Sequence, residues 1–197
     1  MNLKFNMKSD WQNGIVILKN GGVGVLPTDT LYGLVASIYS KKAVEKIYKI
    51  KERDKSKALI VLIHSLKDLE KFWIKVDRDQ AKILKKFWPG GVSILLSCKS
   101  PKFKYIHRGT NEIAFRMISK KHRGLYDLIK KVGPIVAPSA NKEKEKPAEN
   151  IKQARGYFED KVDFYINHGK RIGESSTLIR IKDSYIEILR QGKVKIK

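Results

Sequence analysis

Apolar residues are grouped in two different ways along the chain, and each grouping predicts a different element. Short continuous apolar runs bounded by charged or turn-forming residues are typical of buried strands. Such runs predict strands over residues 23–26, 58–63, 92–97, 112–117 and 134–139, and near 162–166, 177–181 and 185–189. The run at 58–63 is apolar at every position, so we expect a central strand that is buried on both faces of its sheet.

Apolar residues spaced three or four positions apart predict helices between these strands. The expected helices cover residues 11–22, 41–54, 65–73, 78–88, 124–133 and 151–158. Ser9 or Asp10 is the expected cap of the first helix and Ser40 that of the second, because short polar side chains accept the free N–H groups at a helix start. Strands and helices alternate without a repeat, so the sequence predicts one α/β domain over residues 1–197 with a mixed, largely buried sheet.

The chain is strongly basic, with 42 Lys and Arg against 20 Asp and Glu and a formal net charge of +22 over 197 residues. A surface of this charge attracts polyanions such as nucleic acid or nucleotides. The lysines are spread along the chain rather than gathered in a tail, so a solvated basic surface without a partner explains them equally well. The segment 142–146, KEKEK, is expected to be a mobile charged loop.

The composition argues against several classes of protein. Cys98 is the only cysteine, which excludes a disulfide framework and a thiolate metal cage. No apolar run approaches the roughly 20 residues of a membrane span, and the first ten residues lack the apolar core of a signal peptide. A soluble cytoplasmic protein is therefore expected.

Familiar catalytic and cofactor fingerprints are missing from the sequence. The glycines at 21, 22 and 24 do not form G-x-G-x-x-G, and neither a P-loop nor a G-x-S-x-G elbow occurs. The four histidines lack metal-ligand spacing, and each is interpreted as a surface or loop residue: His64, His107, His122 and His168. No protein-bound metal is therefore predicted.

Polar clusters occur instead at the ends of the predicted strands. They are Thr28, Asp29, Thr30 and Tyr32; Lys51, Arg53 and Lys57; Ser139 and Asn141; Ser175, Ser176 and Thr177; and Arg190. Arg116 lies inside an apolar strand, where an unpaired guanidinium would be costly. Each cluster alone also fits a turn, a helix cap or a solvated face. Because ligands of open α/β sheets bind where strand ends converge, the set together predicts a site for an anionic ligand such as a nucleoside triphosphate.

The same stretches, in the same order, resemble the motifs of a known family. They are PTDTLYGL, KIKERDKSKALIVLI, FWPGGVSILL, IAFRM, APSAN, ESSTLIR and ILRQG, between residues 21 and 192. The ordered set is similar to the YrdC-like family, the L-threonylcarbamoyladenylate synthases, in its short single-domain form. The resemblance implies a twisted mixed sheet flanked by helices, with a basic concave face.

The resemblance also implies a reaction and its participants. L-Threonine and bicarbonate would form a carbamate that attacks the α-phosphate of ATP, giving threonylcarbamoyl-AMP and pyrophosphate, with Mg²⁺ held mainly by the phosphates. Partner proteins would then transfer the threonylcarbamoyl group to tRNA, which could also touch the basic surface. By the family's motifs, L-threonine would contact Thr30, Tyr32, Arg116 and Ser176, and ATP would contact Lys51, Arg53, Lys57, Ser139, Asn141 and Arg190. No side chain would act as a nucleophile, so catalysis would rest on positioning and charge neutralisation.

Three stretches depart from the family's pattern. Leu62 stands where a substrate-contacting histidine often lies, and Glu112 replaces a threonine that commonly contacts the nucleotide. The segment after the SAN motif is one residue longer than usual and carries KEKEK. Two other functions stay open: a YrdC-like paralogue that uses another carbamoyl donor, and a non-catalytic RNA-binding module. Retention of the nucleotide-binding motif residues argues against the second.

Overall fold

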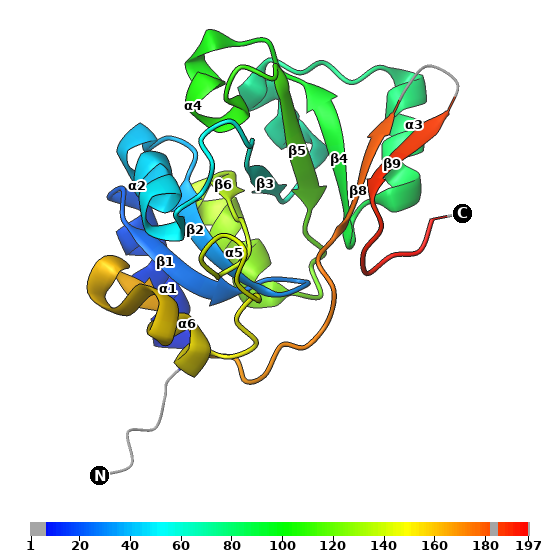
Figure 1. The fold of residues 1–197 in the computed structure, drawn as a ribbon. Coiled ribbons are helices and arrows are strands. Elements are labelled where there is room, and N and C mark those ends of the chain that lie inside the picture. The colour runs from blue at the N-terminus through cyan, green and yellow to red at the C-terminus, as the bar shows by residue number, and fades with distance from the viewer. Residues whose placement is uncertain (1–6, 182–184, 197) are drawn as a thin grey trace.

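The computed structural model describes residues 7–181 and 185–196 (Figure 1). Its α-helices are α1 (Met7–Lys19), α2 (Lys41–Lys51), α3 (Arg78–Phe87), α4 (Lys104–His107), α5 (Arg123–Val132) and α6 (Ile151–Phe158). Short 3-10 helices are η1 (Leu66–Phe72), η2 (Pro101–Phe103) and η3 (Glu159–Lys161). The strands are β1 (Val23–Pro27), β2 (Tyr32–Ser37), β3 (Ile60–Ile63), β4 (Val92–Ser97), β5 (Glu112–Met117), β6 (Ile135–Val136), β7 (Phe164–Tyr165), β8 (Thr177–Ile181) and β9 (Ile186–Arg190).

The strands form one mixed sheet, which confirms the predicted α/β architecture. Their order is β7-β1-β2-β6-β3-β5-β4-β8-β9, and Figure 1 shows the sheet twisting from β1 on one side to β9 on the other. In the middle of the sheet β3 and β5 run parallel, with Leu62 directly opposite Arg116. Strand β5 also pairs with β4 on its other side. Arg116 therefore lies on an interior strand, on the same face of the sheet as Leu62.

Alternate strand residues enter two hydrophobic cores, one on each face of the sheet. Val61 and Ile63 of β3 belong to the larger core, together with residues of α2, α3, α6 and η1. Leu62 belongs to the smaller core, which α1 and α5 cover. Strand β3 is thus buried on both faces, as its continuous apolar run predicts.

Strand β2 lies outside the strands that the apolar runs predict. All six of its residues are buried, and it pairs antiparallel with β1, from Val23 opposite Ala36 to Pro27 opposite Tyr32. Residues 28–31 join the two strands, and the N–H and hydroxyl of Thr28 donate to the Leu31 carbonyl at 3.0 and 2.6 Å. The polar motif of the candidate site is therefore the tip of a buried hairpin. Because this tip is so short, its polar residues and the second strand merge into one motif in the sequence.

Two helical segments differ from the prediction. Helix α1 starts at Met7, ahead of the expected cap at Ser9 or Asp10. Within the expected helix at 65–73, residues Leu66–Phe72 form the 3-10 helix η1. Buried Asp68 accepts from the N–H groups of His64 and Ser65, at 2.9 and 3.3 Å, and pairs with the Lys71 ammonium at 2.6 Å. These local polar contacts fix the tight turn, which apolar spacing alone does not reveal.

The interpretation of His107 as a surface or loop residue is wrong. His107 is only 3% exposed and is the last residue of α4. Its Nδ1 accepts from the Gly109 N–H at 3.1 Å, and its Nε2 lies 3.3 Å from the Ser100 carbonyl. One neutral tautomer satisfies both contacts, so the imidazole is buried without an unpaired polar atom.

The loop 142–146, which its charges predict to be mobile, makes hydrogen bonds through Glu143 and Glu145. The Glu143 carboxylate accepts from the Asp54 N–H and the Lys57 ammonium, both at 2.6 Å. The Asn141 amide donates to the Glu145 carbonyl at 2.8 Å. The two Glu143 contacts link the loop to the segment that follows α2.

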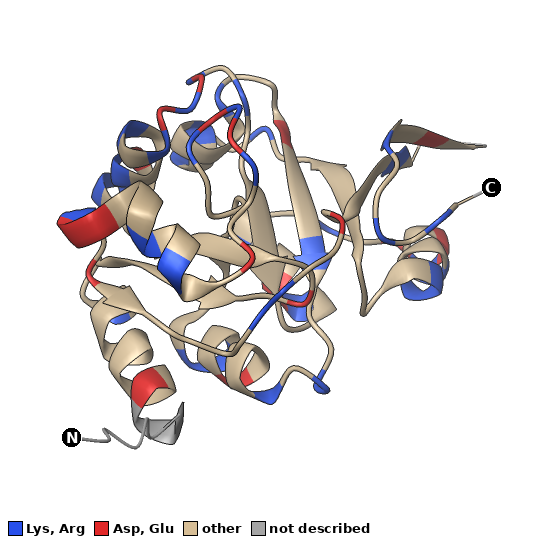
Figure 2. Cartoon of the chain, turned by 60° about the horizontal axis from the view of Figure 1, so that its bottom comes forward, with Lys and Arg blue, Asp and Glu red and all other residues tan. Residues whose placement is uncertain are grey.

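Basic residues are distributed over helices, strands and loops, with acidic residues among them (Figure 2). Among the described helices, none is long and apolar enough to cross a membrane.

Candidate active site

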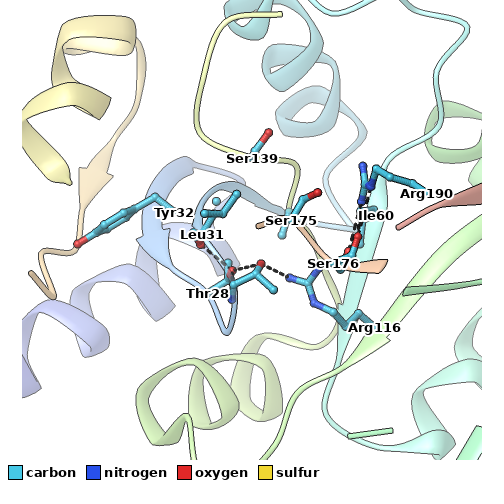
Figure 3. Close-up of a pocket in the computed structure, with 12 residues that line it drawn as sticks. Thr28, Leu31, Tyr32, Ile60, Arg116, Ser139, Ser175, Ser176 and Arg190 are labelled. Carbon is cyan, nitrogen blue, oxygen red and sulfur yellow. Dashed lines mark hydrogen bonds between the residues drawn. The ribbon is translucent and has the colours of Figure 1, made fainter. Parts of the chain in front are cut away.

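Segments from distant parts of the chain come together and line a cavity (Figure 3). Hydroxyl, guanidinium and apolar groups line it: Thr28, Thr30, Leu31, Tyr32, Gly33, Ile60, Arg116, Ala137, Ser139, Ser175, Ser176 and Arg190. The cavity brings together all four residues that the sequence assigns to L-threonine and two that it assigns to ATP. It lies where the hairpin tip, strand β5 and the start of β8 converge.

Arg116 is the charged centre of this cavity. Its Nε donates to Oδ1 of Asp29 at 3.1 Å, and its Nη2 lies 3.0 Å from the same oxygen. Both side chains are only 4% exposed. The ion pair removes the cost of burying an isolated guanidinium. Nη1 takes part in neither contact, so one terminal nitrogen of the fork stays outside the ion pair.

The hairpin tip is held from two sides. The hydroxyls of Thr28 and Thr30 lie 3.2 Å apart, and Arg116 Nη2 donates to Thr30 Oγ1 at 3.4 Å. Figure 3 shows these contacts as a chain of dashed lines between Thr28 and Arg116. From the C-terminal segment, Lys193 Nζ donates to the Asp29 carbonyl at 2.9 Å. The tip is therefore fixed between β5 and the C-terminal segment.

The opposite wall is built from the segment before β8 and the end of β9. The hydroxyl of Ser176 lies 2.8 Å from that of Ser93, and Arg190 Nη2 donates to the Ser176 carbonyl at 2.9 Å. A side chain at Gly192 would place its Cβ 2.3 Å from the Ser175 carbonyl oxygen, so the close approach of these segments requires glycine.

Positive charge accumulates around this wall. Burial lowers the pKa of Arg190, and the charges of Arg116 and Arg53 lower it further. Three guanidinium groups thus share one region of the molecule. Such a field favours an anionic ligand.

Tyr32 and Ser139 complete the cavity in different ways. The Tyr32 hydroxyl donates to the Gly169 carbonyl at 2.7 Å and accepts from the His168 N–H at 3.0 Å. In Figure 3 this hydroxyl points away from the other lining residues. Burial raises the pKa of Tyr32, which keeps the phenol protonated. The Ser139 hydroxyl donates to Oδ1 of Asn141 at 2.6 Å.

Lys51 and Asn141 do not line this cavity but lie behind the turn that carries Ser139. The buried Lys51 ammonium donates to the carbonyls of Ser139 and Asn141, both at 2.8 Å, and to Asn141 Oδ1 at 2.9 Å. Burial lowers the pKa of Lys51 to about 7, and the Arg53 charge adds to the effect. In this structure the ammonium supports the 139–141 turn through three acceptors.

Arg53 and Lys57 line a separate, open cavity with Glu143. Arg53 Nη2 donates to the Ala58 carbonyl at 2.9 Å, and Lys57 Nζ pairs with Glu143 at 2.6 Å. Lys57 is 54% exposed in its side chain, so this group is solvated. The residues assigned to ATP are thus distributed over the inner cavity, the turn behind it and this outer cluster.

Two residues that depart from the family's motifs, Leu62 on β3 and Glu112 on β5, each have defined contacts in the structure. Leu62 is fully buried and belongs to the smaller core. Glu112 accepts from Arg180 at 3.0 Å (Nε) and 2.8 Å (Nη2). A carboxylate at position 112 is therefore neutralised by its own arginine partner.

Sequence reasoning misses the partner of Arg116. Asp29 was identified only as part of a polar cluster, although a buried arginine requires a buried anion. That requirement, with Asp29 in a motif beside apolar strands, is the signal that could have found it. Lys193 carries no such signal, because only the chain's return past the hairpin tip brings it to Asp29.

The described residues contain no group of three or more His, Cys, Asp or Glu side chains placed to hold a metal ion.

Comparison with known proteins identifies the family. Residues 16–192 match the family model Sua5_yciO_yrdC, described as "Telomere recombination". The chain belongs to this family.

Curated relatives carry a consistent name. The threonylcarbamoyl-AMP synthase of Bacillus subtilis is 30% identical over 182 residues, covering 89% of this chain and 51% of the relative. The threonylcarbamoyl-AMP synthase of Hahella chejuensis is 29% identical, covering 91% of this chain and 97% of the relative. This chain therefore spans about half of the first relative and nearly all of the second.

A solved structure agrees in fold. The crystal structure of Pyrococcus abyssi Sua5 complexed with L-threonine superposes with a TM-score of 0.84 and 29% identity. The match covers 92% of this chain and 54% of that one.

Proposed function

We propose that this chain is a threonylcarbamoyl-AMP synthase. It would combine L-threonine, bicarbonate or CO2 and ATP into threonylcarbamoyl-AMP and pyrophosphate, and partner proteins would use the adenylate to modify tRNA. The observation that carries the proposal is the convergence of Thr30, Tyr32, Arg116 and Ser176 on one cavity. The family's curated names and the threonine complex of a relative support it.

The cavity suits an amino acid whose amine carries a carbamate. Arg116 would bind the threonine carboxylate through the part of its fork that Asp29 leaves outside the ion pair. The hydroxyls of Thr30 and Ser176 would hydrogen-bond the polar atoms of the substrate. Tyr32 would contribute its ring, since its hydroxyl is bonded to the 168–169 backbone.

The carbamate oxygen would attack the α-phosphorus of ATP, and pyrophosphate would leave with the electron pair of the broken P–O bond. Arg190 and Ser139 line the cavity and would contact the nucleotide, and Arg53 and Lys57, which line the separate open cavity, would contact its phosphates. Lys51 and Asn141 would act by holding the Ser139 turn in place. Positioning and charge neutralisation would supply the acceleration, with no covalent intermediate on the protein.

Mg²⁺ is expected to arrive with ATP. None of the described residues lining the cavity carries a carboxylate, and the nearby Asp29 is paired with Arg116. These donors do not form a protein cage for the ion, which fits a metal coordinated mainly by phosphate oxygens. The ion would neutralise the phosphate charge.

The test is pyrophosphate release by the purified chain with ATP, Mg²⁺ and bicarbonate, with each amino acid supplied in turn. Release should require L-threonine and bicarbonate together. Equal release with L-alanine, or without bicarbonate, contradicts the proposal. Release that depends on carbamoyl phosphate instead of threonine identifies a paralogue with another carbamoyl donor.

A further inference from the structure

A second cavity lies beside the candidate site and has no part in the proposed reaction. Its volume is about 270 Å³. It lies between residues 121–125, at the start of α5, the loop around 168–171 and the start of the hairpin tip. Thr28 lines both cavities, so the two are neighbours.

This cavity is lined by an unusual set of side chains. Half of its lining residues are basic: Lys121, His122, Arg123, His168 and Arg171. Among the described residues that line it, none is acidic. Trp11 forms an apolar wall and packs closely on Gly124, where an added Cβ would lie 2.3 Å from the indole.

Arg171 carries an unmet hydrogen-bonding requirement here. Its Nη2 lies 3.3 Å from Nδ1 of His168, but its Nε is buried and has no hydrogen-bond partner within the described chain. A buried guanidinium donor without an acceptor is uncommon and costly. An anion in the cavity would supply that acceptor.

The surrounding charges do not compensate this set. Burial lowers the pKa of His122; Asp29 opposes this effect, while the charges of Arg171, Lys193 and Arg116 reinforce it. Asp29 is already paired with Arg116. The positive charge of the cavity therefore comes from Lys121, Arg123 and Arg171, and among the described residues that line it no carboxylate competes with an incoming anion.

We propose that this second cavity binds a phosphate group, separately from the candidate ATP site. A phosphate carries close to two charges and three or more acceptor oxygens, which several basic side chains satisfy together better than a single carboxylate does. The group can come from a small molecule, such as inorganic pyrophosphate, or from the backbone of an RNA strand. The proposal does not depend on the synthase reaction, because none of the basic residues lining this cavity is assigned to that reaction.

The test uses the three tryptophan indole N–H signals in the NMR spectrum of the full chain. Pyrophosphate, and in a second arm a short single-stranded RNA, is titrated at constant ionic strength. Trp11 reports on the cavity, and exposed Trp73 reports on non-specific binding elsewhere. Arg171→Ala and Arg123→Ala remove charges from two different lining segments, and Lys130→Ala on α5 removes one charge outside the cavity.

We expect the Trp11 signal to shift on titration while the Trp73 signal stays in place. The midpoint should rise at least tenfold in both arginine variants and stay within twofold in Lys130→Ala. A shift by pyrophosphate identifies a small-molecule source, and a shift by RNA alone identifies a strand. The proposal is overturned if neither ligand moves the Trp11 signal. It is equally overturned if both arginine variants keep the parent's midpoint.

Discussion

Each end of the candidate site holds an ion pair, and the two pairs differ in how deeply they are buried. At the inner end, Arg116 and Asp29 form an ion pair in which both side chains are 4% exposed. At the outer end, Lys57 and Glu143 pair across the open cavity, with side chains 54% and 19% exposed. Both pairs join oppositely charged groups at about 3 Å or less. Because they differ in burial, the two pairs should contribute differently to the free energy of unfolding.

Burial decides how strongly a pair affects the free energy of unfolding, because removing one member of a buried pair leaves an uncompensated charge in a medium that solvates it poorly. The same removal at the surface leaves a charge that water solvates. The inner end is therefore pre-organised to receive a small ligand of fixed shape. The outer end can adjust to a flexible chain of phosphates.

The largest effect is expected for Asp29→Ala. This change leaves the Arg116 guanidinium buried without its anion and should lower the free energy of unfolding by about 3–5 kcal/mol. Urea denaturation followed by circular dichroism measures it. The matched control is Glu187→Gln at the partly exposed Arg180 pair, which should cost less than about 1 kcal/mol. Equal losses in the two variants would show that the burial of the pair has no energetic consequence.

The next effect concerns ligand binding at the inner end. Arg116→Lys keeps the charge opposite Asp29 but loses the planar fork, so L-threonine should bind about 1.5–3 kcal/mol more weakly while ATP affinity changes little. Isothermal titration of each ligand into parent and variant measures both. Unchanged threonine affinity would exclude Arg116 as the carboxylate-binding residue.

A smaller effect follows from the buried Lys51 between the two ends. Its pKa of about 7 in the folded chain lies far below the ordinary value of 10.5, so between these values the unfolded chain binds more protons. The free energy of unfolding of the parent should therefore rise with pH in this window. Between pH 7 and 9, we expect the free energy of unfolding of the parent to rise by on the order of 1–2 kcal/mol relative to that of Lys51→Met.

Urea titrations of both proteins at each pH provide the comparison. Taking the difference between parent and variant cancels the other groups that titrate in this range. Parallel pH profiles would mean that the ammonium keeps its proton throughout, stabilised by its three oxygen acceptors.

The smallest effect is expected at the outer end. Glu143→Gln removes the charge opposite Lys57 and should leave the free energy of unfolding nearly unchanged, because water solvates the remaining ammonium. ATP affinity should rise slightly or stay unchanged, because Lys57 loses a competing anion. A loss of stability as large as that caused by Asp29→Ala would show that the buried and the exposed pair do not differ in their effect on the free energy of unfolding.

Much of the fold follows from local pattern. The run at 58–63 predicts a strand buried on both faces because water-avoiding side chains at consecutive positions need cover on both sides, and β3 has it. Strand β2 was not predicted, because its glycine-containing start belongs to the same short stretch as the polar hairpin tip. The sequence analysis assigns His107 to the surface or a loop, because a sequence does not show which backbone atoms will satisfy an imidazole.

By itself, the sequence determined that Thr30, Tyr32, Arg116 and Ser176 belong to one ordered set of motifs, and that an Arg116 guanidinium without an anion beside it would be costly. These are properties of residue type and order, which need no coordinates. Tertiary structure alone decided that Asp29 is that anion, that Lys193 holds the hairpin tip, and that Lys51 supports a turn far along the chain. It also decided that basic residues from two distant segments share a second cavity. Such partners are separated by tens to more than a hundred residues, and only chain packing brings their atoms within hydrogen-bonding distance.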